Sequence, residues 1–166
     1  MGERCKYVIG VDFGSDSVRA VLVDALHGGI VNSTWSEYPR WKERKYCDGS
    51  VSMFRQHPQD YLDSMKECVS RLTSECGKDV AENIAAIGFD TTGSTPCPVN
   101  RHGVPLSLLP EFSDNPNAMF YLWKDHTAVR EAEEVNEILS HNSIEDLRSS
   151  REYILQSGIG AKFFMG

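Results

Sequence analysis

The sequence predicts an α/β protein, a mixed β-sheet flanked by helices. Two runs of apolar and β-branched residues, at positions 7–13 and 18–23, follow one another near the start of the chain. The Gly-Ser-Asp-Ser segment between them is a hairpin signal. Two segments with helical spacing and a further apolar strand come later in the chain. Strands and helices are thus mixed along one chain, as in α/β proteins.

The predicted hairpin, residues 7–23, is apolar on both faces of both strands. Strands with that pattern belong inside a sheet that is covered on two sides. A third strand is predicted from Ile30 to Tyr38, after a turn at Gly28 and Gly29. Residues 39–53 have mixed charge and no periodicity, so we predict a loop there.

The first helix is predicted to begin at His57-Pro58, because proline is tolerated at the first helical position. It should end at Gly77, since glycine commonly terminates helices. A buried strand over residues 84–89 follows and ends at Asp90. The inward face of the helix is a stripe at helical spacing, made of Tyr61, Leu62, Met65, Val69 and Leu72.

Residues 91–96 are predicted to form a polar loop, followed by a short strand at 97–100 and a turn at 101–103. A second helix is predicted from Asp125 or Thr127 to about Leu139, and the pattern fades beyond Ser140. Its inward face would consist of Ala128, Ala132, Val135 and Leu139. Three strands, a helix, a strand and a helix is the order typical of the ribonuclease H-like fold. Actin, the Hsp70 chaperones and sugar kinases share that fold, so the order alone assigns no function.

Composition excludes several classes of protein. The 166 residues suffice for one domain with a core, and 40% hydrophobic and 25% charged residues are ordinary for a globular protein. The net charge of −7 disfavours a nucleic-acid surface. No run approaches the roughly 20 apolar residues of a membrane span, and the start of the chain does not resemble a signal peptide. Five cysteines without a CxxC pair indicate reduced thiols, so we expect a cytoplasmic protein.

Asp12 is the first candidate site residue, because a carboxylate at the end of an apolar strand is costly to bury unpaired. It could bind Mg²⁺ on a nucleotide, or it could accept hydrogen bonds from the next turn; spacing alone leaves both open. In the turn at residues 14–17, small residues allow backbone amides to approach a phosphate. Most such turns bind nothing, however, and merely supply turn geometry.

Asp90 is a third candidate. Beside Asp12 on a neighbouring strand it would complete a two-carboxylate metal site. The alternative, which the small residues after it favour, is that Asp90 fixes the loop through hydrogen bonds to the backbone. Residues 123–127 are the fourth candidate. Asp125 could cap the helix that follows, the more frequent role for such an Asp, whereas Trp123 beside polar side chains could stack on a sugar.

These candidates lie where the sequence resembles the FGGY carbohydrate kinases, and the L-ribulokinases among them. Residues 9–20 (IGVDFGSDSVRA) resemble the phosphate-binding hairpin that opens these kinases. The resemblance covers about residues 7–139, leaving the tail from 140 to 166 unplaced. Ribulokinase-like segments also occur at 38–41 (YPRW), 57–61 (HPQDY) and 90–96 (DTTGSTP), and most specifically at 110–120 and 123–128 (WKDHTA).

The resemblance implies ATP-dependent phosphorylation of L-ribulose, or a related pentulose, at its terminal hydroxyl in arabinose breakdown. It implies that Asp12 lies near Mg²⁺. It further implies that the ATP phosphates face Gly14, Ser15, Asp16, Ser17 and Arg19. The residues that would line the sugar pocket are Thr92, Gly93, Ser94, Trp123, Lys124 and Asp125.

FGGY kinases are much longer than this chain and close two actin-like domains over ATP and sugar. Their catalytic base is an Asp located beyond the position of Gly166, and their adenosine pocket belongs mostly to the second domain. The resemblance therefore predicts the N-terminal portion of the first, actin-like domain, incomplete and catalytically inactive by itself. Uncovered apolar surface would favour self-association.

Two other functions compete with this one. A metal-dependent nuclease of the same fold would use Asp12 and Asp90 as ligands, but the chain has no basic surface for nucleic acid. A non-catalytic module that binds a sugar or a partner protein is the second.

Overall fold

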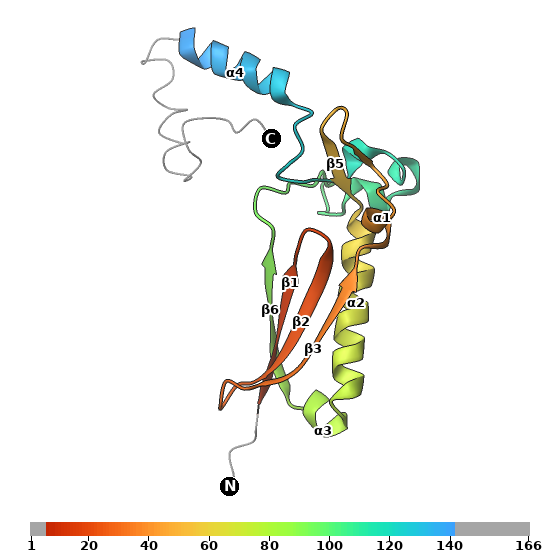
Figure 1. Ribbon diagram of the computed structural model, residues 1–166, viewed down its shortest axis with the longest axis vertical. Coiled ribbons are helices and arrows are strands. Elements are labelled where there is room, and N and C mark those ends of the chain that lie inside the picture. The colour runs from red at the N-terminus through yellow and green to blue at the C-terminus, as the bar shows by residue number, and fades with distance from the viewer. Residues whose placement is uncertain (1–5, 142–166) are drawn as a thin grey trace.

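The computed structural model describes residues 6–141, and its centre is a four-stranded mixed sheet (Figure 1). The strand order is β3-β2-β1-β6. Strands β1 (Tyr7–Phe13), β2 (Ser17–Asp24) and β3 (Ile30–Glu37) form an antiparallel meander, and β6 (Ile84–Thr91) pairs with β1 in parallel. The predicted α/β class and the predicted N-terminal hairpin are confirmed, and the predicted strands at residues 30–38 and 84–89 correspond to β3 and β6.

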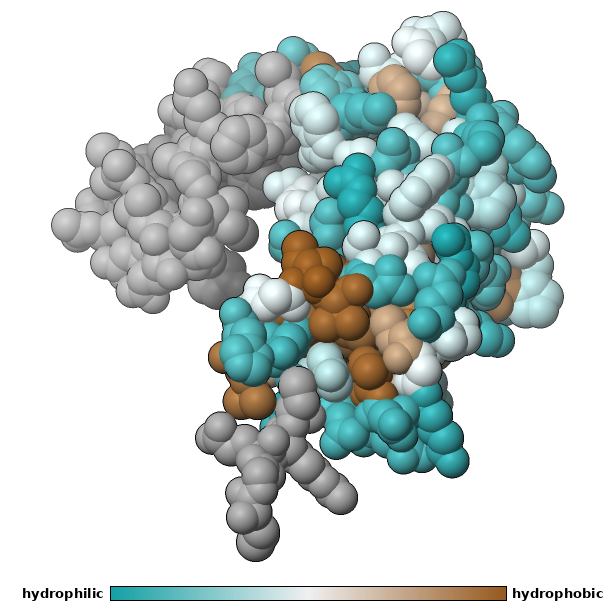
Figure 2. All heavy atoms as spheres, turned by 60° about the horizontal axis from the view of Figure 1, so that its bottom comes forward, coloured by the Kyte–Doolittle hydropathy of each residue, from teal (hydrophilic) through white to brown (hydrophobic). Residues whose placement is uncertain are grey.

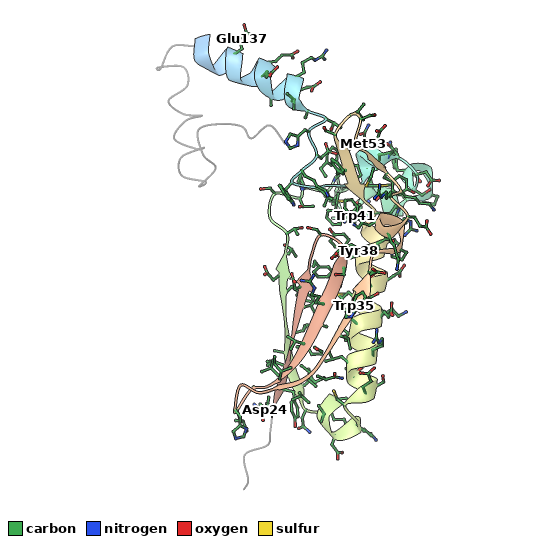
Figure 3. The ribbon with its side chains drawn as sticks, viewed as in Figure 1. Asp24, Trp35, Tyr38, Trp41, Met53 and Glu137 are labelled. Atoms are coloured by element: carbon green, nitrogen blue, oxygen red, sulfur yellow. The ribbon has the colours of Figure 1, made fainter. Side chains whose placement is uncertain are left out.

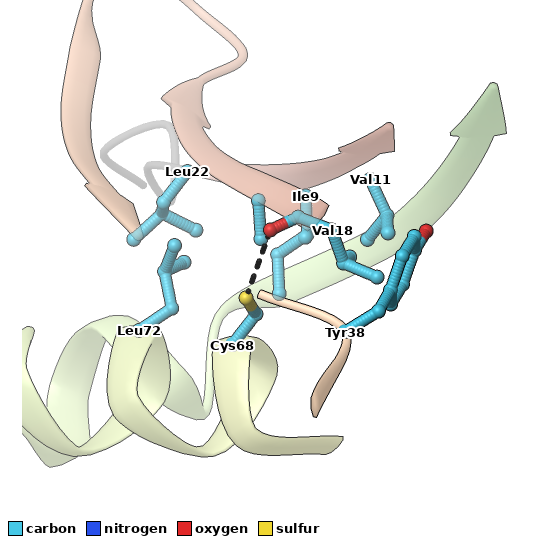
Figure 4. Close-up of a cluster of buried hydrophobic side chains, with 8 residues drawn as sticks. Ile9, Val11, Val18, Leu22, Tyr38, Cys68 and Leu72 are labelled. Carbon is cyan, nitrogen blue, oxygen red and sulfur yellow. Dashed lines mark hydrogen bonds between the residues drawn. The ribbon is translucent and has the colours of Figure 1, made fainter. Parts of the chain in front are cut away.

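Helix α2 (Pro58–Glu75) connects β3 to the parallel strand and covers one face of the sheet (Figure 1). It begins at Pro58 after the cap residue His57, whose ring accepts a hydrogen bond from the amide of Gln59. Gly77, with φ of +82°, ends the helical segment as predicted. Figure 4 shows the core between helix and strands, with the Cys68 thiol 3.4 Å from a strand carbonyl. This core consists of Ile9, Val11, Val18, Ala20, Leu22, Tyr38, Cys68 and Leu72.

The prediction that both faces of the hairpin are covered is wrong for the described part of the chain. Helix α2 covers the face of Ile9 and Val11, whereas Arg19 on the opposite face is exposed. The apolar residues on that opposite face are only half-buried, because no described element packs on them. Apolar side chains consequently reach the surface (Figure 2).

The segment predicted as a loop, residues 39–53, is partly ordered. It contains helix α1 (Pro39–Lys42) and strand β4 (Cys47–Asp48), and it leads into β5 (Met53–Gln56). Together with β7 (Phe120–Tyr121), the last two strands form a second, three-stranded sheet in the order β4-β5-β7. Sequence periodicity could not reveal strands of two residues.

Short helices flank β6 along the sequence. Helix α3 (Lys78–Ala81) precedes β6, and the 3₁₀ turns η1 (Leu106–Leu108), η2 (Pro110–Phe112) and η3 (Pro116–Ala118) follow it. The predicted strand at 97–100 is reduced to one bridge, between residues 99 and 105.

Helix α4 (Val129–His141) begins later than predicted and lies away from the sheet in Figure 1. Ala128 precedes it and is exposed, and Ala132 is half-buried, so the predicted inward face is wrong at the first position. The side chains of Val135 and Leu139 lie outside the described part, as does everything predicted for residues 142–166. None of the described helices is long and apolar enough to cross a membrane.

Candidate functional site

The turn at residues 14–17, here called the phosphate turn, is held with its carbonyl groups toward the protein. The Ser15 carbonyl accepts a 2.7 Å hydrogen bond from Nε2 of Gln56. The Asp16 carbonyl accepts a 3.0 Å bond from the amide of Tyr38. The amides of Ser15 and Asp16, by contrast, donate to no group among residues 6–141. The turn therefore keeps donors available for an external acceptor.

Gly14 is required by the close approach of the two strands at this turn. Its amide donates to the Ser17 carbonyl at 3.0 Å. A Cβ atom on Gly14 would stand 3.3 Å from that same carbonyl oxygen, which is tighter than ordinary contact. A larger residue would therefore push the turn open.

Three charged side chains lie in a row across the open face of the sheet. Asp12 on β1 is opposite Arg19 on β2 and opposite Asp90 on β6. Arg19 lies 3.6 Å from the Asp12 carboxylate and 3.9 Å from that of Asp16. The side chains of Arg19 and Asp12 are 62% and 47% exposed. Charges this exposed remain free to bind a ligand, because water already solvates them.

The row borders an open cleft of about 400 Å³. Gly10 and Gly88 form part of its floor, and the space above Gly88 is open, whereas a Cβ atom on Gly10 would stand 3.3 Å from the Val21 side chain. Asp90 also accepts a 2.9 Å hydrogen bond from the amide of Thr91, so the structural role considered for it is present. The other Asp90 oxygen accepts no hydrogen bond from the described residues, so the two roles are compatible.

The donor set suits a magnesium ion that is carried by a nucleotide. Mg²⁺ is typically bound through one or two carboxylates plus waters and phosphate oxygens. Asp12 and Asp90, side by side on parallel strands, provide two carboxylates. Within the described residues there is no cluster of three or more Asp, Glu, His or Cys, so a metal cage formed by protein alone is not found there.

The loop after β6 leads from this row to a second hollow. The Thr92 amide donates to the Phe13 carbonyl at 3.2 Å, which fixes the start of the loop to β1. Gly93 and Ser94 are exposed, Ser94 with φ of +53°, and so remain accessible to a ligand. The Thr92 and Thr95 hydroxyls, 3.3 Å apart, lie at the second hollow.

This second hollow has a volume of about 360 Å³ and largely apolar walls. Tyr61 is at its centre and stacks on Phe13 and Tyr38, with ring centroids 5.5 and 4.6 Å apart. Phe120 contacts the same ring at 4.6 Å. Figure 3 shows Tyr38 where the large sheet meets the smaller one. The hollow thus adjoins both the phosphate turn and the loop at 91–96.

Residues 123–125, predicted together as sugar contacts, occupy three different environments. Trp123 is 60% exposed. Lys124 places its ammonium 4.7 Å from the Trp41 ring and 4.8 Å from the Phe54 ring. Asp125 is 1% exposed. Only the first of the three is free to contact a ligand as it stands.

Asp125 is the centre of a buried ion pair with Arg55, and both side chains are 2% exposed. Its carboxylate accepts hydrogen bonds from the Phe54 amide at 2.8 Å, from Nε of Arg55 at 2.6 Å and from the Thr127 hydroxyl at 2.6 Å. The prediction that Asp125 caps the second helix is wrong, because α4 begins at Val129. Both carboxylate oxygens accept hydrogen bonds within the chain, so a direct contact of Asp125 with a sugar stays a prediction that requires these bonds to rearrange.

Arg55 is equally satisfied. Its guanidinium donates to the Pro116 carbonyl at 3.3 Å, to Oδ1 of Asn117 at 3.2 Å and to the Thr127 hydroxyl at 2.7 Å. It also lies over the Tyr121 ring, 3.4 Å from the centroid. We call Arg55, Asp125 and these partners the Arg55 cluster. The segments most specific to the family resemblance thus meet in a structural centre.

The electrostatics of the Arg55 cluster favour the charged carboxylate. Burial opposes ionisation of Asp125, but the hydrogen bonds from Arg55 and Thr127 and from two backbone amides outweigh burial. The pKa of Asp125 is therefore lowered from its ordinary value of 3.8.

Arg55 and Gln56 were missed from the sequence, because they lie between the segment predicted as a loop, which ends at residue 53, and the predicted helix start at His57. Two long polar side chains directly before a helix start are a weak signal for buried hydrogen bonding. That signal could have led us to predict a structural role for these two residues. Both are 2% exposed, and each binds a segment far away in sequence.

The known proteins that are similar in sequence to this chain include several ribulokinases. The chain is 48% identical over 141 residues to the ribulokinase of Vibrio parahaemolyticus, a match covering 85% of this chain and 25% of that protein. It is 36% identical over 138 residues to the ribulokinase of Halalkalibacterium halodurans, covering 80% and 24%. The chain therefore spans about a quarter of the length of these relatives. No family model matches it.

The fold has a counterpart among solved structures. A gluconate kinase from Lactobacillus acidophilus superposes with a TM-score of 0.59 at 20% identity, covering 80% of this chain and 23% of the kinase. At that identity the likeness concerns the fold alone.

Proposed function

We propose that this chain, a homologue of the ribulokinases, forms the phosphate-binding part of an enzyme that transfers a phosphoryl group from ATP to L-ribulose. The observation that carries the proposal is the phosphate turn. The carbonyl groups of Ser15 and Asp16 are bound inward by Gln56 and Tyr38, whereas the amides of these two residues have no acceptor among residues 6–141. An anion recognised by backbone amides suits this arrangement. The homology supports ATP and a pentulose as the substrates.

In this proposal, the amides of Ser15 and Asp16 and the Ser15 hydroxyl bind the transferred phosphate and the phosphates of the departing ADP. Gly14 and Ser17 hold the turn instead, because the Gly14 amide donates to the Ser17 carbonyl and the buried Ser17 hydroxyl donates to the Asp16 carboxylate. Arg19, largely exposed, adds a positive charge beside the phosphates. Asp12 and Asp90 would hold Mg²⁺, which neutralises charge on the phosphates during transfer. Phosphoryl transfer requires mainly positioning and charge neutralisation, and these residues supply both.

The sugar is proposed to lie beside the loop at residues 91–96. Thr92, Gly93 and Ser94 offer hydroxyl and backbone groups, and the exposed Trp123 ring offers an apolar face. Lys124 is held against aromatic rings and would reach a ligand only by leaving them. Asp125 contributes indirectly, because the Arg55 cluster holds the segment that carries Trp123.

The proposed cellular location is the cytoplasm, as expected for an ATP-dependent sugar kinase. The family resemblance assigns the catalytic base to a position outside the residues matched here. We therefore expect the 166-residue chain alone to give no ribulose-dependent release of ADP in a coupled assay. Turnover by the isolated chain would contradict this assignment of the base.

A chimera tests the proposal directly. The matching segment of the Vibrio parahaemolyticus ribulokinase would be replaced by residues 6–141 of this chain, and ribulose-dependent ADP formation measured. We expect an active enzyme, and an Asp12→Asn change in it should reduce kcat by about a hundredfold or more. Asp79→Asn, a change at an exposed helix end, serves as the matched control and should leave kcat unchanged. A folded chimera without activity would refute the proposal.

A further inference from the structure

We propose that Gln56 is a positioning residue that aims the Asp16 amide of the phosphate turn toward the phosphate. The inference rests on the proposed function and adds a residue that the sequence comparison gave no role. Gln56 itself is 2% exposed and lies behind the turn, so it would not touch the ligand.

Both ends of the Gln56 side chain are used. Its Nε2 donates to the Ser15 carbonyl at 2.7 Å, and its Oε1 accepts a 2.5 Å hydrogen bond from the Tyr61 hydroxyl. Burial raises the pKa of Tyr61 to about 12, so the hydroxyl keeps its proton at neutral pH and can donate. Because Tyr61 fixes the amide oxygen of Gln56, the amide nitrogen is directed at Ser15.

The geometry of the peptide group explains how the bond from Gln56 to the Ser15 carbonyl orients the Asp16 amide. In a planar trans peptide, the carbonyl of one residue and the amide N–H of the next point in opposite directions. The Ser15 carbonyl and the Asp16 N–H belong to one peptide group. Holding the carbonyl inward therefore directs the N–H outward, toward the side where Asp12 and Arg19 lie exposed.

The support behind Gln56 is a closely packed aromatic cluster. The Tyr61 ring is packed between Tyr38 and Phe120, with both centroids 4.6 Å away. Tyr38 in turn donates its backbone amide to the Asp16 carbonyl at 3.0 Å, so it holds the next peptide group of the same turn. One aromatic cluster thus orients two consecutive peptide groups.

A partly buried ion pair joins the two segments that supply this cluster. Arg40, two residues after Tyr38, pairs with Asp60, whose carboxylate also accepts the Arg40 amide at 3.1 Å. Asp60 immediately precedes Tyr61 and is 2% exposed. The family-like segments at residues 38–41 and 57–61 therefore form one support for the phosphate turn, although neither lines the cleft beside it.

The test uses the whole 166-residue chain, labelled with ¹⁵N and titrated with magnesium tripolyphosphate. In the wild type we expect the Ser15 and Asp16 amide signals to shift on titration. Gln56→Met keeps the length and volume of the side chain but can neither donate to Ser15 nor accept from Tyr61. We expect it to shift these two amide signals already in the absence of ligand, and to raise the dissociation constant about tenfold.

Two variants separate positioning from general stability. Gln59→Met makes the same chemical change at a partly exposed site on α2 and should leave affinity and the turn signals as in the wild type. Tyr61→Phe keeps the aromatic stack and the bond from Gln56 to Ser15, but leaves Oε1 unfixed. We expect it to weaken binding about threefold, roughly the effect of one neutral hydrogen bond.

Each outcome has a definite meaning. If the wild-type amides do not respond to tripolyphosphate, the proposed function fails. If the wild type binds and Gln56→Met binds equally well, only the positioning role is overturned. If Gln56→Met does not fold, Tyr61→Phe decides: wild-type affinity with unmoved Ser15 and Asp16 signals would overturn the role, and weaker binding with shifted signals would support it.

Discussion

The phosphate turn and the Arg55 cluster both contain charged residues that the sequence marked as site candidates, and the structure treats them in opposite ways. At the turn, Arg19 and Asp12 are 3.6 Å apart with side chains 62% and 47% exposed. In the cluster, Arg55 and Asp125 are 2.6 Å apart and 2% exposed. The same pair of residue types therefore forms a loose surface pair in one place and a buried pair in the other.

The difference lies in unused hydrogen-bonding capacity. Both oxygens of the Asp125 carboxylate accept hydrogen bonds from protein donors. Such bonds are needed to offset the free-energy cost of removing a charge from water. The phosphate turn leaves two amides without protein acceptors within the described part. Unused hydrogen-bond donors beside exposed charges indicate a binding site. A buried ion pair whose hydrogen-bonding groups are all occupied within the protein indicates a structural centre.

The largest expected effect is a loss of stability when the buried pair of Arg55 and Asp125 is broken. Asp125→Asn leaves the Arg55 guanidinium buried without its counter-charge, and removing one partner of a buried pair typically costs about 3–5 kcal/mol. We expect a loss of about 3 kcal/mol in the free energy of unfolding, measured by urea denaturation followed by circular dichroism. A loss below about 1 kcal/mol would show that the cluster is not a structural centre.

The matched control is Glu82→Gln, which removes the charge from an exposed i,i+4 pair with Lys78. Exposed pairs of this kind contribute about 0.3–0.5 kcal/mol, so the free energy of unfolding should change by no more than that. The contrast between the two variants isolates burial as the cause.

The next effect is a dependence on pH that belongs to the buried pair. The pKa of Asp125 is lowered in the folded chain from the ordinary value of 3.8 that it takes when unfolded. Its contribution to stability is therefore complete above that value and is lost as the pH falls through the folded pKa. The stability gap between the wild type and Asp125→Asn should narrow as the pH is lowered from 5 to below 3.8. Urea melts across that range measure it, and a constant gap would contradict the direction of the shift.

The same contrast explains how far the sequence could be interpreted. The hairpin, α2 and the position of β6 were predictable, because long apolar patterns are decided by local periodicity. The predicted burial of β6 is wrong for the described part of the chain, since every residue of this strand after Ile84 is exposed. Strands β4 and β7 were not predictable, since two residues have no period and gain their pairing only from distant segments. The covered second face of the sheet was also expected wrongly, because apolar residues show that a surface is fit to be covered but not what covers it.

Asp125 shows the corresponding limit for site prediction. A carboxylate just before a helix is compatible with a cap, a ligand contact and an ion pair, and the choice depends on a residue 70 positions earlier, Arg55. The phosphate turn could be predicted as a candidate, because glycine and small polar residues act locally. The inward fixing of its carbonyl groups by Gln56 depends on tertiary contact, and no local pattern contains it.

A smaller effect on stability is expected at the exposed side of the comparison. Asp12→Asn in the 166-residue chain removes a solvent-screened partner of Arg19, so the free energy of unfolding should change by less than about 1 kcal/mol. Urea denaturation beside Asp125→Asn measures the contrast. Equal losses for the two variants would mean that Asp12 serves stability, and the distinction between the two regions would fail.

The smallest expected effect concerns uncovered apolar surface next to the candidate site. Phe89 on β6 is 58% exposed, and Ile87 on the same strand is 43% exposed. These two residues pair with Val11 and Ile9, so they extend the apolar face that α2 covers over the neighbouring strands. We expect an apolar surface in that position to favour association with another copy of the chain.

Phe89→Ser should therefore weaken self-association severalfold while changing the free energy of unfolding by about 1 kcal/mol or less, since much of the ring is already in water. Sedimentation velocity over a range of concentrations measures the association. Val51→Ser, at a residue that is 57% exposed in the segment between β4 and β5, is the control and should leave association unchanged. If both variants associate as the wild type does, β6 is not the contact surface. If Phe89→Ser instead unfolds the chain, its ring contact with Phe13, 6.2 Å between centroids, belongs to the core rather than to the surface.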